Sequence, residues 1–161
     1  MRARIDNRLI HGQIAVNWKQ VLKFETVVVV DDQLAADALN KAVMKMTVRA
    51  ASVTGYFVSV AHALTLLPKL AKQNQPSLFG NAQEDKLFIV CRTPETLRQL
   101  VEGGVAIDEV TIWNMYMHPG KQRMASSVYM DEQDLQAIAA IKRCGTEVAI
   151  QETPRSKKII L

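Results

Sequence analysis

The segment Thr26-Val27-Val28-Val29-Val30-Asp31-Asp32 decides the fold class of this chain. It is short, rich in β-branched residues and ended by two acids, which is typical of a β-strand. Its valines leave no polar face, so both sides of the strand must be covered by other parts of the protein. Buried strands of this kind occur in parallel sheets that carry helices on both sides.

Six further segments have strand character. The strongest is Lys86–Cys91, which is continuously apolar after its first residue. The others are Arg2–Ile5, Gly55–Ser59, Glu109–Trp113, Ser127–Met130 and Glu147–Gln151. The sequence therefore predicts about seven strands in total.

Helical segments lie between the strands. Thr93 is placed to cap a helix whose first turn holds Pro94, and Gly103-Gly104 ends it. A second helix is predicted from Asp131 to Gly145. Apolar residues at helical spacing predict three more, over Gln13–Leu22, Leu34–Met46 and Val60–Lys72.

Two of these helices carry more specific expectations. In the segment 34–46, Leu39, Val43 and Met46 recur at helical spacing, which favours a face turned to the core. In the segment 60–72, Pro68 is expected to kink or end the helix. Gln73–Ser77 is too short to separate domains and is predicted to be a surface loop.

The alternation of strand and helix predicts an α/β fold. We expect a doubly wound, mainly parallel open sheet of about seven strands with helices on both faces. The length of 161 residues suits a single domain over residues 1–161.

Composition excludes several protein classes. With 48% hydrophobic and 22% charged residues, the chain is not broadly disordered. Cys91 and Cys144 form neither a disulfide framework nor a zinc motif, and each is expected to be a buried small hydrophobe. No apolar run approaches the ~20 residues of a membrane span, and the start of the chain lacks the apolar core of a secretory signal. We expect a soluble cytoplasmic protein.

The loop after the first predicted strand concentrates reactive groups. Ligands of open α/β sheets bind beyond the carboxyl ends of the strands, and the loop after Ile5 lies there. It contains a carboxylate, a guanidinium and an imidazole, those of Asp6, Arg8 and His11, directly before a predicted helix. The free backbone N–H groups at the helix start, those of Gly12, Gln13 and Ile14, favour a negatively charged ligand.

These groups suit phosphoryl transfer. Histidine is largely neutral at cytoplasmic pH, so the ring of His11 can attack phosphorus without a separate base. Arg8 offers a planar fork for the phosphoryl oxygens. Asp6 is placed either to orient the ring through its other nitrogen or to cap the helix. One histidine beside one arginine is also compatible with a loop that has no chemistry.

Other candidates have weaker signals. Lys121 and Arg123 either add positive potential beside the phosphate, or face an acidic partner, or lie in a solvated loop. His62 is assigned no role, and His11, His62 and His118 lack the spacing of a metal site. Asp31-Asp32 can imitate a magnesium site but is more typical of a turn or a cap. The motifs that bind ATP or a dinucleotide do not occur, so we expect neither cofactor nor metal.

The segment Arg4–Gln13 resembles the active-site loop of the enzyme IIB components of the phosphoenolpyruvate-dependent sugar phosphotransferase system, mannose/fructose/sorbose family. The segments Thr26–Asp32, Cys91–Gly104 and Ser127–Asp134 resemble the same family, as do Met115 and Gly120-Lys121. The resemblance spans nearly the whole chain and is faint from about Met44 to Gln83.

The resemblance implies a role for each loop residue. His11 would carry the phosphoryl group transiently, Arg8 would contact the phosphate and Asp6 would support the loop. The donor would be the phosphohistidine of a IIA protein, and the acceptor a sugar bound by membrane IIC and IID partners. The chain would then work in the cytoplasm, at the inner face of the membrane through those partners.

Two positions depart from the family pattern. Asn7 stands where many relatives carry a second Asp, and Trp113 stands where relatives often have Gly, so the cleft at that strand end is altered. The sugar stays open between a hexose and an amino sugar, with a slight preference for N-acetylgalactosamine. The sequence does not determine which ring nitrogen of His11 is phosphorylated. It also does not determine the oligomeric state, and a homo-oligomer is one of the options.

Two other functions compete with this one. The net charge of +4 motivates a basic nucleic-acid-binding module, although the basic residues are dispersed and lack interleaved aromatic residues. The third alternative is a noncatalytic interaction module that has kept the fold.

Overall fold

The protein is described here by a computed structural model, which covers residues 1–12, 14–73 and 86–161. Most of the loop predicted at Gln73–Ser77, and Gln13, lie outside these residues. The elements, in chain order, are β1 (Arg2–Ile5), η1 (Ile14–Trp18), α1 (Lys19–Leu22), β2 (Thr26–Val30), α2 (Asp32–Ala36), α3 (Ala38–Ala50), β3 (Thr54–Val58), α4 (Val60–Gln73), β4 (Leu87–Cys91), α5 (Pro94–Glu102), β5 (Glu109–Ile112), β6 (Gln122–Ala125), β7 (Val128–Met130), α6 (Glu132–Arg143), β8 (Glu147–Ile150) and β9 (Ile159–Ile160).

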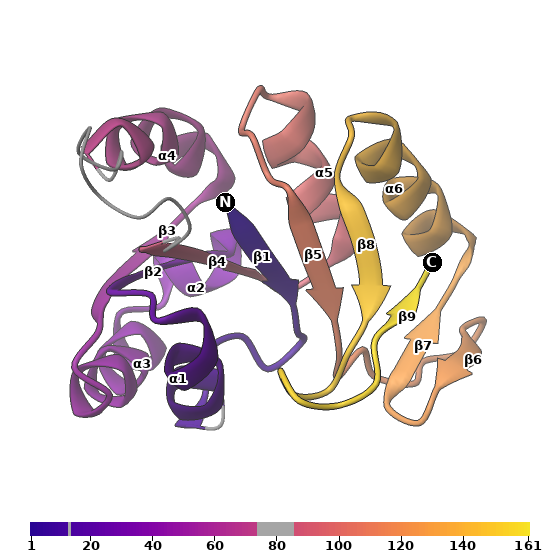
Figure 1. Cartoon of the computed structure of the whole chain (residues 1–161), viewed down its shortest axis with the longest axis horizontal. Helices are drawn as coiled ribbons and strands as arrows, with labels where there is room; N and C mark the ends of the chain where they lie inside the picture. Colours follow the sequence, from indigo (N-terminus) through magenta and orange to yellow (C-terminus); the bar gives the residue numbers. More distant parts are fainter. Residues whose placement is uncertain (13, 74–85) are drawn as a thin grey trace.

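A seven-stranded sheet in the order β3-β2-β4-β1-β5-β8-β9 forms the centre of the molecule (Figure 1). Its pairs are parallel, except that β9 runs antiparallel to β8. From β1 the chain adds β2, β3 and β4 on one flank of β1 within the sheet. It then crosses from β4 to β5, on the opposite flank of β1, and continues outward to β8 and β9. The predicted doubly wound, mainly parallel fold is confirmed.

Alternating valines divide the core between the two faces of the sheet. Val28 and Val30 pack into a cluster with the buried residues of α4, α5 and α6. Val27 and Val29 pack into a second cluster with η1, α2 and α3. Because side chains of a strand alternate between faces, one short apolar segment supports both helical layers.

The membership of the sheet differs from the sequence expectation at one strand. Ser127–Met130 was expected as a strand, and β7 forms there, but it pairs with β6 in a separate two-stranded hairpin. The seventh strand of the main sheet is β9, which consists of Ile159 and Ile160. Two residues are too few for any periodicity to predict them.

The helix ends follow the predicted capping residues. The Thr93 hydroxyl accepts a hydrogen bond from the Thr96 N–H at 3.2 Å. Asp131 accepts from the Asp134 N–H at 2.9 Å, and Asp134 accepts from the Asp131 N–H at 3.2 Å, which is a reciprocal capping box. The bond from the Asp134 N–H, together with the charge of Lys121, holds the pKa of Asp131 below its ordinary value. The helix predicted over 34–46 is broken at Asp37, whose carboxylate caps α3.

Two expectations about burial are wrong, and one about a helix is wrong in part. Pro68 does not end α4, which continues to Gln73 with Leu67 and Leu70 buried in the core; a kink, the other effect expected of Pro68, stays a prediction. Cys144 lies exposed at the end of α6, whereas Cys91 is buried as predicted. The apolar face of α3 points to solvent, since Leu39 and Met46 are 75% and 72% exposed. α3 packs beside β3, which is the edge strand of the sheet. Among the described residues no strand lies beyond β3, so the first turns of α3 have no sheet surface to pack against.

Substitutions in α3 and α5 test this difference in burial. Leu39→Ala is expected to change the free energy of unfolding by less than about 0.5 kcal/mol, because Leu39 is already in contact with water. Leu97→Ala on α5 removes a side chain with no exposed surface and is expected to cost about 2–5 kcal/mol. Urea denaturation of both variants measures the two values, and equal losses would contradict the placement of α3.

Candidate functional site

The strands β1, β2, β4 and β5 end at one level, which brings their following loops together. Ile5 pairs with Cys91 on one side and with Ile112 on the other. Cys91 in turn pairs with Val30 of β2. Residues directly after these strands therefore share one edge of the sheet, at the point where the strand order reverses around β1.

Asp6 is the buried centre of this edge, with no exposed surface. One carboxylate oxygen accepts the Arg8 N–H at 3.0 Å. The other accepts from the Asn114 amide at 3.0 Å and from Arg4 Nε at 3.3 Å. A carboxylate without solvent must be paired and hydrogen-bonded, and these three donors meet that requirement.

Arg4 connects Asp6 to the segment that follows β8. Its two terminal nitrogens donate to the backbone oxygens of Gln151 and Glu152, at 3.0 and 3.3 Å. Its guanidinium carbon lies 4.9 Å from the centre of the Trp18 ring system, as in a cation–π contact. Burial lowers the pKa of the guanidinium, and the Asp6 carboxylate opposes that shift.

Asn7 and Arg92 hold the loop between β1 and η1. The Asn7 side chain donates to the Arg92 backbone oxygen at 2.8 Å and accepts the Tyr116 N–H at 2.7 Å. Arg92 donates to the Asn7 backbone oxygen at 2.9 Å and forms a two-pronged ion pair with Asp31, at 2.6 and 3.3 Å. Asp31 also caps α2 through the Leu34 N–H, so the interpretation of Asp31-Asp32 as a cap is confirmed.

The imidazole of His11 lies next to this network of hydrogen bonds. The His11 side chain is 17% exposed, and its Nε2 lies 3.6 Å from an Asp6 oxygen. That separation is too long for a hydrogen bond, and Nε2 is buried without a hydrogen-bond partner among the described residues. Asp6 was expected either to orient the His11 ring or to cap the following helix. In the structure its carboxylate lies beside the ring and does not cap the part of the helix that the structure describes. Leu9 and Ile10 are buried beneath the loop.

The helix start differs from the sequence expectation. The segment Ile14–Trp18 is a π-helix, η1, and the α-helix α1 covers only Lys19–Leu22. Wider turns of this kind frequently occur at functional sites. Ile14 lines the cavity beside His11, and an added Cβ at Gly12 would meet no atom within 4 Å. Gln13, the third residue predicted to bind phosphate, lies outside the described residues.

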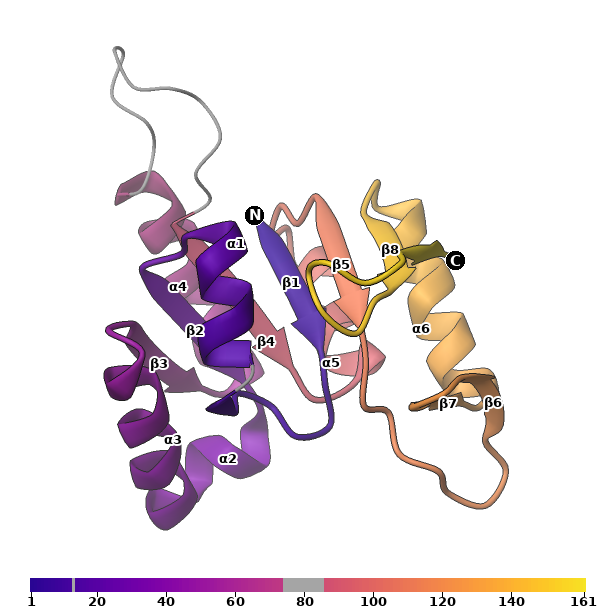
Figure 2. The same ribbon diagram turned by 60° about the horizontal axis from the view of Figure 1, so that its bottom comes forward.

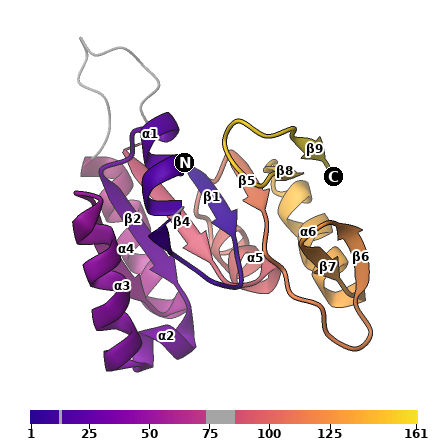
Figure 3. The ribbon, with the colours of Figure 1, turned by 90° about the horizontal axis from the view of Figure 1, so that it is seen from below.

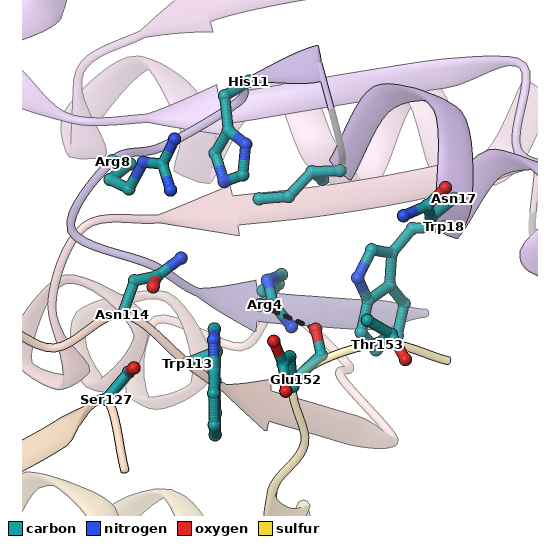
Figure 4. A pocket seen from close by; sticks show the side chains of 11 residues that line it. Arg4, Arg8, His11, Asn17, Trp18, Trp113, Asn114, Ser127, Glu152 and Thr153 are labelled. Atoms are coloured by element: carbon teal, nitrogen blue, oxygen red, sulfur yellow. Dashed lines mark hydrogen bonds between the residues drawn. The ribbon is translucent and has the colours of Figure 1, made fainter. Parts of the chain in front are cut away.

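A polar cavity of about 170 Å³ opens beside His11 (Figure 4). Arg8 and His11 form one side of it, and Arg4 lies between the two sides. The residues of the other side follow β5 and β8 or lie in the turn between β6 and β7. Figures 2 and 3 show these elements on the opposite side of β1 from α1. That side consists of Trp113, Asn114, Ser127, Glu152 and Thr153.

The two basic residues predicted to bind phosphate do not line this cavity. The Lys121 ammonium bonds to Asp134 and lies 3.6 Å from Asp131, because the acidic cap of α6 attracts it. Arg123 donates to the Ala125 backbone oxygen at 3.2 Å. His62 and His118 are exposed and also lie outside the cavity lining. Among the described residues, no group of three metal-ligating side chains comes together.

Sequence reasoning missed several residues of the site. Arg4 was assigned only to the strand Arg2–Ile5, although a charged residue that a central strand turns inward has to be paired. Asn114 has a positive φ of 49°, which its short amide side chain tolerates. Glu152 and Thr153 follow the last predicted parallel strand, and the rule that ligands bind at carboxyl ends could have found them.

The arrangement can bind and transfer a small anion. Arg8 supplies a cation, the loop supplies an imidazole backed by a buried carboxylate, and the cavity gives room for more than one polar group. A water molecule needs about 10–15 Å³ of such space, so a phosphoryl group and part of a second reactant fit together. No helix within the described residues is both long and apolar enough to cross a bilayer.

Comparisons with known proteins agree with this geometry. The IIB component of the N-acetylgalactosamine-specific phosphotransferase enzyme (component 1) of Escherichia coli strain K12 is 36% identical over 96% of this chain and 91% of its own. The mannose-specific EIIAB component from the same strain is 31% identical over 98% of this chain and 45% of its own.

Solved structures show the same fold. The crystal structure of the Escherichia coli N-acetylgalactosamine-specific IIB component 1 superposes with a TM-score of 0.86 at 35% identity, over 99% of this chain and 97% of that one. The family described as PTS system sorbose subfamily IIB component matches residues 1–160. The chain therefore belongs to the sorbose subfamily of IIB components of the sugar phosphotransferase system.

Proposed function

We propose that this IIB component carries a phosphoryl group on His11, taking it from the phosphohistidine of a IIA protein and passing it to a sugar. The observation that carries the proposal is the position of the ring, which lies at the rim of a polar cavity with Asp6 behind it and Arg8 beside it. A nucleophile backed by a fixed carboxylate is the arrangement expected for an activated imidazole.

The position of Asp6 supports attack by Nδ1. Nε2 is the nitrogen that faces the buried carboxylate, and a small rotation of the ring would turn the 3.6 Å contact into a hydrogen bond. A proton on Nε2 would then point at Asp6, since the partner of one ring nitrogen sets the tautomer. The lone pair would be left on Nδ1, the nitrogen free to meet phosphorus.

Arg8 and the loop backbone would stabilise the transferred group. Arg8 lines the cavity, and its backbone N–H is fixed by Asp6, so its side chain starts from a rigid point. A guanidinium can bond two phosphoryl oxygens at once. Phosphoryl transfer depends mainly on positioning and charge stabilisation, which are the two contributions this loop can make.

Exposed apolar side chains near the cavity suit a protein donor that binds and leaves. Tyr116 and Met117 follow β5 and are 49% and 67% exposed. The Tyr116 N–H is bonded to Asn7, which attaches this segment to the His11 loop. We therefore place the IIA donor over this segment, with Arg8 at the edge of the contact.

The relatives support the proposed partners and sugar. A IIB component works with IIA and membrane partners, and the relatives include proteins named for N-acetylgalactosamine, mannose and sorbose. The 36% identity to the N-acetylgalactosamine-specific component 1 supports an amino sugar as acceptor, whereas component 2 of the same specificity, at 30%, is about as similar as the mannose-specific protein, at 31%.

A phosphorylation assay tests the role of His11. Incubation with phosphoenolpyruvate and the general phosphotransfer proteins, including a IIA donor, is expected to give an acid-labile label on the wild-type chain, and His11→Ala is expected to abolish it. Arg8→Ala is expected to slow transfer about 10²-fold, because one charge-stabilising donor is lost. NMR of the labelled protein should place phosphorus on Nδ1.

The control is His62→Ala, which removes an exposed histidine that does not line the cavity. Label that persists in His11→Ala would refute the assignment. Salt-sensitive nucleic-acid binding without any label would favour the basic binding module instead.

The buried ion pair makes a separate prediction about stability. Arg4→Met leaves the Asp6 carboxylate without its cation and is expected to lower the free energy of unfolding by about 3–5 kcal/mol. The double variant Arg4→Met with Asp6→Leu is expected to recover part of that loss, because no charge then remains buried. Urea denaturation of the three proteins measures the values, and a loss below 1 kcal/mol in Arg4→Met would show that the pair contributes little.

A charge on the donor-facing segment tests the docking surface. Met117→Asp is expected to raise the KM for the IIA donor about tenfold or more and leave the rate from saturated complex within twofold, since Met117 lies outside the cavity lining. Met124→Asp on β6, also exposed, is the matched control. Equal effects of the two substitutions would contradict the placement of the donor.

A further inference from the structure

Most residues on the side of the cavity opposite His11 have no role in the proposed transfer of the phosphoryl group from the donor to His11. We call Trp113, Ser127, Glu152 and Thr153 the acceptor wall. Accepting a phosphoryl group from a donor needs the imidazole and a cation, and both are supplied from the other side. Figure 4 shows the Glu152 and Trp113 side chains across the opening from His11 and Arg8.

The polar side chains of the acceptor wall are free to bind a ligand. Within the described residues, Ser127, Glu152 and Thr153 make no side-chain hydrogen bond or ion pair with the protein, although they line one shared space. Glu152 is also the one carboxylate among the described residues that line the cavity. Its backbone is held by Arg4, which gives the exposed side chain a fixed origin.

Trp113 supplies the apolar part of this wall. Its side chain is half-buried and packs against the core cluster beneath α5 and α6. Its backbone N–H donates to the Ile5 backbone oxygen at 3.0 Å. A rigid indole beside hydrogen-bonding groups matches the surface of a pyranose, because one ring face carries C–H bonds and the rim carries hydroxyls.

We propose that the acceptor wall receives the hydroxyl-bearing edge of the sugar, with the C–H face on the indole of Trp113 and the reacting hydroxyl donating to Glu152. The inference rests on the proposed function of His11 and adds to it the surface that binds the acceptor. The cavity of about 170 Å³ is smaller than the 300–1,000 Å³ of pockets for whole drug-sized ligands. It therefore encloses one edge of the sugar, and the membrane partner holds the rest.

The transfer step balances with these groups alone. The bond from His11 nitrogen to phosphorus breaks, and a bond from the sugar oxygen to phosphorus forms. The electron pair of the broken bond returns to the ring nitrogen. The hydroxyl proton passes to the Glu152 carboxylate, which is exposed and releases it to water. A carboxylate that takes the proton of the attacking hydroxyl is a recurring part of phosphoryl transfer to alcohols.

Arg4 reduces the cost of placing a carboxylate near a phosphoryl group. Its guanidinium bonds to the backbone of Glu152 and lies between the two sides of the cavity. Charges of opposite sign therefore alternate from Arg8 through the phosphoryl group and Arg4 to Glu152. This order lessens the repulsion between the two anions.

The experiment measures the two half-reactions of the full-length chain separately. The donor step is the rate of labelling of His11 by the phosphorylated IIA protein. The acceptor step is the loss of label to sugar on mixing with membrane vesicles that contain the IIC and IID partners. N-acetylgalactosamine, mannose and sorbose serve as the acceptors.

Glu152→Gln and Trp113→Gly are expected to leave the donor step within twofold of the wild-type rate. The acceptor step is expected to fall about 10²-fold or more in Glu152→Gln, since a proton acceptor is lost. In Trp113→Gly the KM for sugar is expected to rise at least tenfold, and Trp113→Phe should restore most of the affinity. Glu132→Gln, an exposed carboxylate on α6, is the matched control and should change neither step.

The outcomes separate the two proposals. If the wild-type chain acquires no label, the proposed function of His11 is overturned, and the acceptor wall with it. If label forms and both variants discharge to sugar at the wild-type rate, only the acceptor wall is overturned. Equal slowing of both steps would also overturn it, because that pattern indicates a general structural defect.

Discussion

The buried ion pair between Arg4 and Asp6 is the interaction on which the site depends. Both side chains are almost fully excluded from water, and each is acceptable there only because the other is present. Their hydrogen bonds reach three separated parts of the chain, which are the Arg8 backbone, the Asn114 side chain and the backbone of Gln151 and Glu152. Loops that would otherwise be independent are held at fixed positions.

This network explains how a short loop can be rigid. The Asp6 carboxylate fixes the backbone of Arg8, Asn7 and Arg92 bond to each other in both directions, and Leu9 and Ile10 fill the space beneath. His11 therefore stands at the cavity rim with one nitrogen turned inward. If His11 is the nucleophile, as proposed, preorganisation of this kind would lower the cost of bringing the ring and a phosphoryl group together.

Much of the fold could be predicted because it follows from local patterns. The apolar segment ending at Asp31 predicted a strand covered on both faces, and Thr93 and Asp131 predicted the starts of two helices. The elements that were missed or misplaced depend on distant partners. β9 consists of two residues and pairs only because the chain turns back onto β8, and the face of α3 lies exposed because β3 is the edge of the sheet.

The sequence by itself determined the doubly wound fold and the grouping of Asp6, Arg8 and His11, since these residues are neighbours in the chain and the spacing of apolar residues is a local property. Only the tertiary structure decided that Arg4 lies under the site, that Lys121 turns away to the cap of α6, and that Trp113 and Glu152 face His11. Glu152 and His11 are 141 positions apart. Parallel pairing of β1, β5 and β8 places their carboxyl ends at one edge, and no local pattern encodes that meeting.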